Sequence, residues 1–276
     1  MKALKLYENA HLFYLQGEGY PRPSTKTRTS IQTFSSKSRK RLLLVCNKVN
    51  TKAIYGKPIF CTLTYPEHFP VLHSVYKRDL HVFFKKFIRR FPKAVIIWRL
   101  EYQERQAPHY HLLVFNTDKS AWFPGIHKFR SILAVQWNKT VAPNNPAHLS
   151  AGTEASLIKS WRGVTHYVSK YMAKVDQSKC SALGMDSPGR FWGIYNRSLL
   201  PIDEIEVELS REEFHYLRRV ARAILQRKMK RKVYFYGAHS GIMLYIDYDT
   251  ALSILDAAKT NCLPDSEFRS IAEILA

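Results

Sequence analysis

Two histidines separated by one residue are the first feature of the sequence that could perform chemistry. His109 and His111 begin an apolar, partly β-branched stretch, residues 109–116, which predicts a β-strand. Residues i and i+2 of a strand point to the same face of a sheet, so the two imidazoles project together. A predicted strand at 94–102 and a polar turn at 103–108 precede them. The sequence therefore predicts two imidazoles on one face of a β-hairpin, where they could bind a divalent ion.

A carboxylate is expected to join this pair of histidines. A hairpin centred at Arg105 places Glu101 directly opposite His109, and directly paired residues share a face. One carboxylate and two imidazoles suit Mg²⁺ or Mn²⁺ in a site that handles phosphate. A catalytic Zn²⁺ with the same ligand types is a second possibility. The alternative to a metal site is a surface pair that arose by chance among the 11 histidines of the chain.

Two tyrosines with helical spacing could supply a nucleophile. Tyr167 and Tyr171 lie four residues apart in a predicted helix at 161–174, so they share one helix face. Lys170 and Lys174 follow the tyrosines at the i+3 spacing. Nearby cations favour the phenolate, which attacks phosphorus far better than the phenol does. The alternative reading is an aromatic stripe packed into the core, with lysines that reach out to solvent.

Three motifs in this order resemble the HUH endonucleases, and among them the rolling-circle replication initiators. The motifs are the strand FCTLTY at 60–65, the His-x-His strand after the hairpin glutamate, and the helix YVSKYMAK at 167–174. The paired tyrosines resemble the two-tyrosine subgroup of phage and plasmid replication proteins, which includes the A protein of small isometric single-stranded DNA phages and the replication proteins of filamentous phages. The segment GRFWG at 189–193 resembles one common in phage members. The likeness covers about residues 35–202.

The resemblance implies a mechanism for these residues. His109, His111 and Glu101 would hold Mg²⁺ or Mn²⁺ against the scissile phosphate. Tyr167 or Tyr171 would attack it, leaving a 5′-phosphotyrosine on the protein and a free 3′-OH that primes a host polymerase. The second tyrosine would later cleave the regenerated origin, and the displaced strand would be rejoined.

In the same mechanism Lys170, and secondarily Lys174, would hold the phosphate oxygens. Thr62 and Thr64 of the first motif are given a structural role and no chemistry.

Two other functions stay open at this point. A two-tyrosine transposase or relaxase would use the same chemistry on other DNA ends. A non-catalytic nucleic-acid-binding protein would instead stack bases on aromatic side chains of its central strands, and Tyr110 could supply one of these.

The order of the predicted elements indicates an α+β fold with an antiparallel sheet and helices packed on it. The resemblance adds an HUH-nuclease, RNA-recognition-motif-like core, to which the sequence adds a small C-terminal helix–hairpin–helix appendage. The expected organisation is an irregular N-terminal segment at 1–34, the endonuclease domain at 35–202 and a C-terminal accessory module at 203–276. Further strands are predicted at 57–65, 191–195 and 205–209, helices at 38–50, 76–91, 128–138, 210–230 and 250–259, and a β-hairpin at 233–246.

The charge of the chain indicates a polyanionic partner. The 276 residues carry a formal net charge of +21. Residues 1–202 hold 32 Lys and Arg against 10 Asp and Glu, whereas residues 203–276 hold 11 against 12. Single-stranded and origin DNA is therefore the expected partner. The basic helix at 211–232 is the one candidate for a membrane surface, but its apolar stripe is expected to pack on the domain.

Several protein classes are excluded by what the sequence lacks. Four cysteines without a C-x-x-C pair argue against a disulfide scaffold or a zinc knuckle, and favour a reducing bacterial cytoplasm. No stretch approaches the roughly 20 apolar residues of a membrane span. There is no phosphate-binding loop of the type G-x-x-x-x-G-K-[ST], so no ATP is expected and unwinding is assigned to a separate host helicase.

Overall fold

The computed structural model of the chain describes residues 2–7, 13–16, 31, 33–120, 123–159, 189–202, 204–235, 242–244, 246 and 248–260. The chain divides into two compact units. The first comprises Met1–Lys26, Asn47–Thr51 and Ile202–Ala276, and the second comprises Thr27–Cys46 and Lys52–Pro201. In both units an antiparallel sheet is accompanied by helices, which confirms the predicted α+β class.

The sheet of the second unit has five strands in the order β6-β3-β5-β4-β7, and every neighbouring pair is antiparallel. In that order the strands are β6 (Thr153–Leu157), β3 (Tyr55–Thr64), β5 (Pro108–Asn116), β4 (Ala94–Tyr102) and β7 (Trp192–Tyr195). The predicted strands that correspond to β3, β4, β5 and β7 are confirmed. Strand β6 lies where the sequence predicted none. The central strands β4 and β5 are buried along most of their length, because side chains cover them on both faces.

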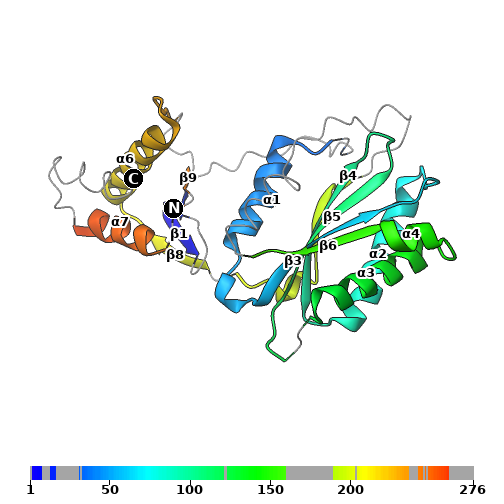
Figure 1. Cartoon of the computed structure of the whole chain (residues 1–276). Helices are drawn as coiled ribbons and strands as arrows, with labels where there is room; N and C mark the ends of the chain where they lie inside the picture. Colours follow the sequence, from blue (N-terminus) through cyan, green and yellow to red (C-terminus); the bar gives the residue numbers. More distant parts are fainter. Residues whose placement is uncertain are drawn as a thin grey trace. The chain divides into compact units, whose positions relative to one another are not determined.

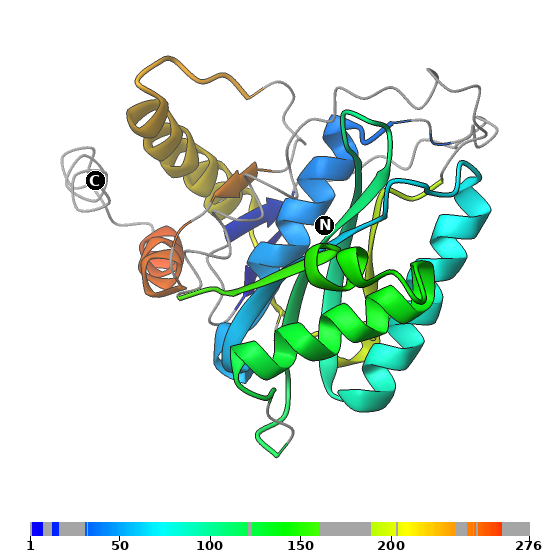
Figure 2. The same ribbon diagram turned by 45° about the vertical axis from the view of Figure 1, so that its right-hand side comes forward.

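The described helices that accompany this sheet are α1 (Ser36–Lys48), α2 (His73–Arg90), α3 (Ile126–Val141) and α4 (Pro146–Ala151). Short 3-10 turns lie at Thr51–Ala53 and Arg197–Leu199. Figure 1 shows α2, α3 and α4 together on one side of the sheet and α1 on the other. Figure 2 shows α2 and α3 running side by side. Their apolar residues recur at helical spacing, and Phe83, Phe87 and Trp137 are at most 1% exposed.

The two faces of the five-stranded sheet therefore have different roles. Tyr110 of β5 points to the side of α2 and α3, where it is fully buried and its hydroxyl donates to the carbonyl of Tyr76 at 3.1 Å. Its neighbours His109 and His111 point to the opposite face, because side chains alternate along a strand. The helices thus support one face of the sheet, and the polar residues gather on the other.

The first unit contains a four-stranded antiparallel sheet with the described helices α6 and α7. The sheet order is β8-β1-β2-β9. The elements are β8 (Glu204–Glu208), β1 (Ala3–Tyr7), β2 (Phe13–Gln16), β9 (Ile242–Leu244), α6 (Arg211–Met229) and α7 (Tyr248–Thr260). Leu4 and Leu6 of β1 pack with Phe214 of α6 and Ile254 of α7 in one apolar core. The predicted helices at 210–230 and 250–259 are confirmed by α6 and α7.

Two expectations for this unit are corrected. The N-terminal segment is not irregular throughout, because it contributes β1 and β2. The described residues do not form the hairpin predicted at 233–246, since Val233–Phe235 lack strand structure and β9 pairs with β2. A two-stranded hairpin alone buries little apolar surface, whereas joining a wider sheet buries Ile242 and Leu244.

The capping box at the start of α6 gives a first testable prediction. Ser210 Oγ accepts a hydrogen bond from the Glu213 N–H at 3.1 Å, and the Glu213 carboxylate accepts one from the Ser210 N–H at 2.7 Å. The substitution Ser210→Ala is expected to lower the stability of the first unit by about 1 kcal/mol. Hydrogen exchange at the α6 amides measures this loss. Ser253→Ala in the interior of α7 is the matched control and should cost nothing, since alanine is the better helix former. Equal exchange in both variants would contradict the role of the cap.

Candidate metal and nucleic-acid site

The register of the sheet brings the predicted site residues to one face. Glu101 of β4 lies directly opposite His109 of β5, so the predicted opposition is confirmed. On its other side His109 lies opposite Thr64 of β3. His111, two residues further along β5, lies opposite Arg99. Glu101, His109 and His111 therefore share a face because of the strand register alone.

The carboxylate contacts the diagonal histidine and not the paired one. Glu101 Oε2 lies 2.8 Å from His111 Nε2. The rings of His109 and His111 are neighbours, with centroids 4.7 Å apart and planes at 82°. Within the described ranges, no group of three His, Cys, Asp or Glu side chains could hold a metal ion as it stands. Glu101 and His111 hydrogen-bond to each other in this arrangement.

His109 is held in a state that suits a metal ligand. Burial lowers the pKa of its imidazole to about 4, with a further contribution from His111, while Glu101 opposes the shift. The ring is therefore neutral at neutral pH. Its Nδ1 lies 3.0 Å from Thr64 Oγ1. A hydroxyl that accepts from Nδ1–H leaves the lone pair of Nε2 available, which is the usual arrangement of a metal-ligating histidine.

Thr64 is fixed from several directions. Its N–H donates to the carbonyl of Gly152 at 2.9 Å. Its carbonyl accepts from Trp137 Nε1 and from His148 Nε2, both at 2.8 Å. Trp137 is fully buried and His148 is 7% exposed. Helices α3 and α4 therefore hold the residue that orients the His109 ring.

Arg105 ties the hairpin turn to the end of β3. Its guanidinium donates to the carbonyl of Tyr65 at 2.6 Å and to that of Pro66 at 2.8 Å. The sequence identified Arg105 only as the centre of the turn. Its position there, with a long side chain and five donors, is the signal that could have suggested this clamp.

A pocket of about 480 Å³ opens beside the histidines. Its volume lies within the range of ligand sites. It is lined by Phe60, Thr62, Thr64, His109, His111, Ala151, Thr153, Glu154 and Ser156. Phe60 stacks on His111, with centroids 5.6 Å apart. The acidic residue Glu154 was missed from the sequence, because the strand that carries it was not predicted.

The expected stacking role of Tyr110 is not supported by its environment. The side chain is fully buried on the helix-covered face, so it is not available to a nucleic-acid base. The non-catalytic alternative loses the aromatic residue on which it relied.

Four of the predicted site residues lie outside the described residues: Tyr167, Lys170, Tyr171 and Lys174. The helix predicted at 161–174 lies outside them as well. Of the GRFWG segment, Phe191 is buried and its carbonyl accepts from the Leu100 N–H at 2.7 Å. Trp192 Nε1 donates to Ser38 Oγ at 2.9 Å. This segment therefore continues the sheet next to β4.

Comparison with known proteins places this site in a family context. The model of a family of replication-associated proteins, described by the name ORF2, matches residues 58–176. The matched stretch contains Glu101, both histidines and both tyrosines, and it covers less than half of the chain. No curated protein matches the sequence. The family match supports a replication initiator, with DNA as its partner. None of the helices that the structure describes is long and apolar enough to cross a membrane.

Proposed function

We propose that the protein is a rolling-circle replication initiator of the HUH type, which nicks single-stranded origin DNA and later rejoins it. The observation that carries the proposal is the register that puts Glu101, His109 and His111 on one sheet face beside a polar pocket. These residues lie within the stretch that the replication-associated family model matches. The nick leaves a 3′-OH for a host polymerase, and a separate host helicase unwinds the duplex.

The donor set fits Mg²⁺ or Mn²⁺. His109 is neutral with Nδ1 engaged by Thr64, and Glu101 and His111 lie within 2.8 Å of each other. These three side chains would hold the cation, with Glu101 and His111 exchanging their mutual hydrogen bond for it. When bound, the cation polarises the phosphoryl oxygens of the scissile phosphate.

The nucleophile in this proposal is a tyrosine hydroxyl. The phenol oxygen of Tyr167 or Tyr171 attacks phosphorus, the bond from phosphorus to the 3′ oxygen breaks, and a 5′-phosphotyrosine forms. The departing 3′ oxygen takes up a proton. Lys170, and secondarily Lys174, would stabilise the phenolate and the phosphate oxygens. The phosphodiester energy is kept in the protein–DNA bond, so cleavage needs no ATP and the second tyrosine can rejoin the strand.

The full-length protein and single-stranded oligonucleotides tiled across the DNA that flanks its gene test this function. With Mn²⁺, one oligonucleotide is expected to be cut at one position, with protein attached to the new 5′ end. EDTA should abolish the reaction. Cleavage that persists in EDTA, or that leaves a free 5′ phosphate on the product, would overturn the proposal.

The contact between Thr64 and His109 gives a separate prediction. Thr64→Val keeps the shape of the side chain but removes the hydroxyl that meets His109 Nδ1. Mn²⁺ binding is expected to weaken roughly tenfold, because residues that orient a ligand typically contribute 10–100-fold to metal affinity. Titration calorimetry with Mn²⁺ measures the change.

Two further variants test the role of the Thr64 hydroxyl. Thr64→Ser should bind Mn²⁺ like the unmodified protein, since it restores the hydroxyl. Thr117→Val removes a hydroxyl that donates to the Lys93 carbonyl, away from the histidines, and is the matched control. The orienting role is wrong if Thr64→Val and Thr117→Val bind Mn²⁺ equally well.

A further inference from the structure

The C-terminal part of the first unit has a nearly balanced charge, but its charges are segregated. Residues 203–276 carry 11 Lys and Arg against 12 Asp and Glu. Within this stretch, residues 211–232 hold nine Lys and Arg against two Glu. The two glutamates lie in the first turn of α6, where one of them closes the capping box. The rest of α6 and the residues after it are therefore strongly cationic.

The apolar core fixes how α6 is rotated. Phe214, Leu217 and Ala221 are fully buried against the core of the first unit. The opposite stripe of the helix is exposed and carries residues at spacings of four, four and three: Arg211, His215, Arg219 and Arg222. At about 1.5 Å per residue this stripe spans roughly 16 Å.

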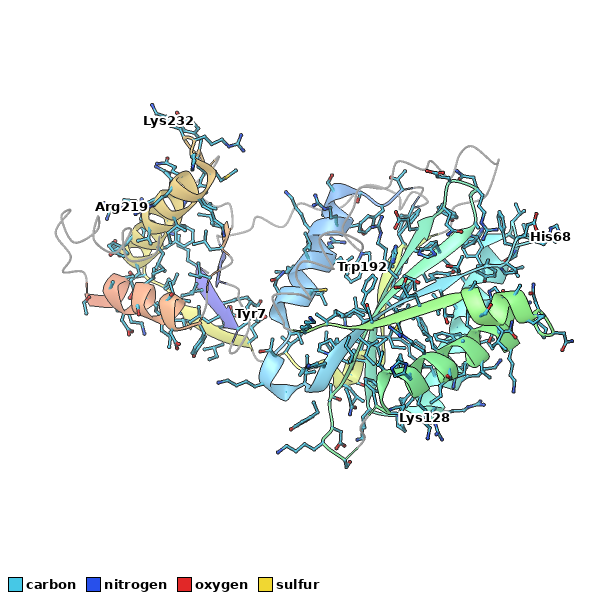
Figure 3. The ribbon with its side chains drawn as sticks, in the orientation of Figure 1. Tyr7, His68, Lys128, Trp192, Arg219 and Lys232 are labelled. Carbon is cyan, nitrogen blue, oxygen red and sulfur yellow. The ribbon has the colours of Figure 1, made fainter. Side chains whose placement is uncertain are left out.

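The stripe continues into a cationic end. Lys228, Lys230, Arg231 and Lys232 are all exposed. Figure 3 draws Arg219 on α6 and Lys232 just beyond its C-terminal end. We call the exposed cations of this helix and its end the α6 cationic face: Arg211, Arg219, Arg222, Lys228, Lys230, Arg231 and Lys232.

The acidic residues of β8 are held apart from this face. Leu4 and Leu6 of β1 face the core that α6 shares, so Lys5 points to the other side of the sheet. There Lys5 Nζ pairs with Glu204 at 2.6 Å and with Glu206 at 3.0 Å. Carboxylates on the far side of the sheet therefore do not neutralise the α6 cationic face at contact distance.

The chemistry of this face selects among anionic partners. Membrane insertion needs an exposed apolar side on the helix, and that side of α6 is buried in the core. Single-stranded DNA is usually held by stacking on aromatic side chains, and the aromatic residues of α6, Phe214 and Tyr216, are buried. A rigid row of cations instead suits a rigid row of phosphates, such as those of a duplex.

We propose that the α6 cationic face binds the phosphate backbone of duplex DNA, as a site separate from the histidine pocket. This inference goes beyond the proposed nicking function, because it concerns double-stranded DNA and residues of the other unit. The contacts are sequence-independent, so they contribute affinity and residence on the duplex and no base readout.

The test compares two triple variants of the full-length protein that remove the same charge. Arg219→Gln, Arg222→Gln and Lys230→Gln change the α6 cationic face. Lys85→Gln, Arg89→Gln and Arg90→Gln change exposed cations of α2 in the second unit. Binding to a random-sequence duplex of about 30 base pairs is measured by fluorescence anisotropy between about 50 and 200 mM salt.

The α6 triple variant is expected to bind the duplex at least about tenfold more weakly. Its slope of log K against log salt should fall by roughly 0.9 for each lost phosphate contact, or about 2.7 in total. The α2 variant should keep the original slope. Exchanging lysine and arginine at the three α6 positions, so that charge is retained, should preserve binding and excludes misfolding as the cause.

Three outcomes would overturn the inference. Equal losses in the α6 and α2 variants would mean that net charge alone acts. A loss confined to single-stranded DNA, or to vesicles with anionic lipids, would assign the face to another partner. A loss of duplex binding in Tyr234→Ala, whose ring is 66% exposed beyond α6, would indicate base stacking. Mn²⁺-dependent cleavage of a short single strand by the α6 variant reports separately on the proposed nicking function.

Discussion

Replacing His111 by alanine is expected to weaken Mn²⁺ binding more than about 100-fold and to remove strand cleavage. The imidazole links the other two proposed ligands, since it contacts the Glu101 carboxylate at 2.8 Å and its ring lies beside that of His109. Residues that merely orient a ligand contribute about 10–100-fold to metal affinity, so loss of a ligand should exceed that range. Titration calorimetry with Mn²⁺ and a cleavage assay with the tiled oligonucleotides measure the two effects.

Two controls separate metal binding from folding. His127→Ala removes an exposed histidine of α3 and should leave Mn²⁺ affinity and cleavage unchanged. Glu101→Gln keeps the size of the side chain and its capacity for a hydrogen bond but removes the charge, so it should fold and bind Mn²⁺ weakly. If His111→Ala binds Mn²⁺ and cleaves as well as His127→Ala does, the proposed metal site is wrong.

The double substitution Tyr167→Phe and Tyr171→Phe should abolish cleavage and covalent attachment completely. Phenylalanine keeps the aromatic ring and removes the hydroxyl oxygen that would attack phosphorus, so no other step can substitute for it. Mn²⁺ binding and duplex binding should be unchanged, because neither uses these hydroxyls in the proposed mechanism. Gel analysis of protein–oligonucleotide adducts provides the measurement.

The single tyrosine variants sharpen this prediction. One of them should still cut the strand once but fail to transfer it a second time, because the two hydroxyls act in succession. Tyr234→Phe removes an exposed hydroxyl in the first unit and is the matched control. Undiminished cleavage by the double variant would show that the nucleophile is another group or water.

The hairpin that carries the histidines could be predicted because its information is local. A polar turn between two apolar strands determines the register, and the register alone places Glu101 opposite His109. What the register could not predict is the contact that the carboxylate makes. Its oxygen reaches the diagonal His111, which depends on side-chain torsions and on the hydroxyl that holds His109.

The support of the site could not be predicted, because it depends on distant parts of the chain. The Thr64 carbonyl accepts from Trp137 and His148, which are 73 and 84 residues away. Strand β6, which brings Glu154 to the pocket, is short, and its apolar alternation is too brief to stand out. Local patterns do not encode which distant donors meet one carbonyl.

The first unit shows the same limit at a larger scale. Strand β1 pairs with β8, whose residues follow about 200 positions later. The glycines and prolines after β2 made the whole N-terminal segment look irregular. The capping box and apolar stripe of α6 are local signals, and the structure confirms both. Net charge summed along the chain concealed the cationic face, because acidic and basic residues are separated by the sheet.

The most direct test of the central claim is to map the atom of the protein that becomes joined to DNA. Trypsin cuts after Lys170, so Tyr167 and Tyr171 fall on different peptides, GVTHYVSK and YMAK. After cleavage with Mn²⁺, nuclease trimming and trypsin digestion, mass spectrometry should find a nucleotide on one of these tyrosines, joined through its 5′ phosphate. The other DNA product should carry a 3′-OH that a polymerase extends. An adduct on any other residue, or a cut strand with no adduct at all, would contradict the account.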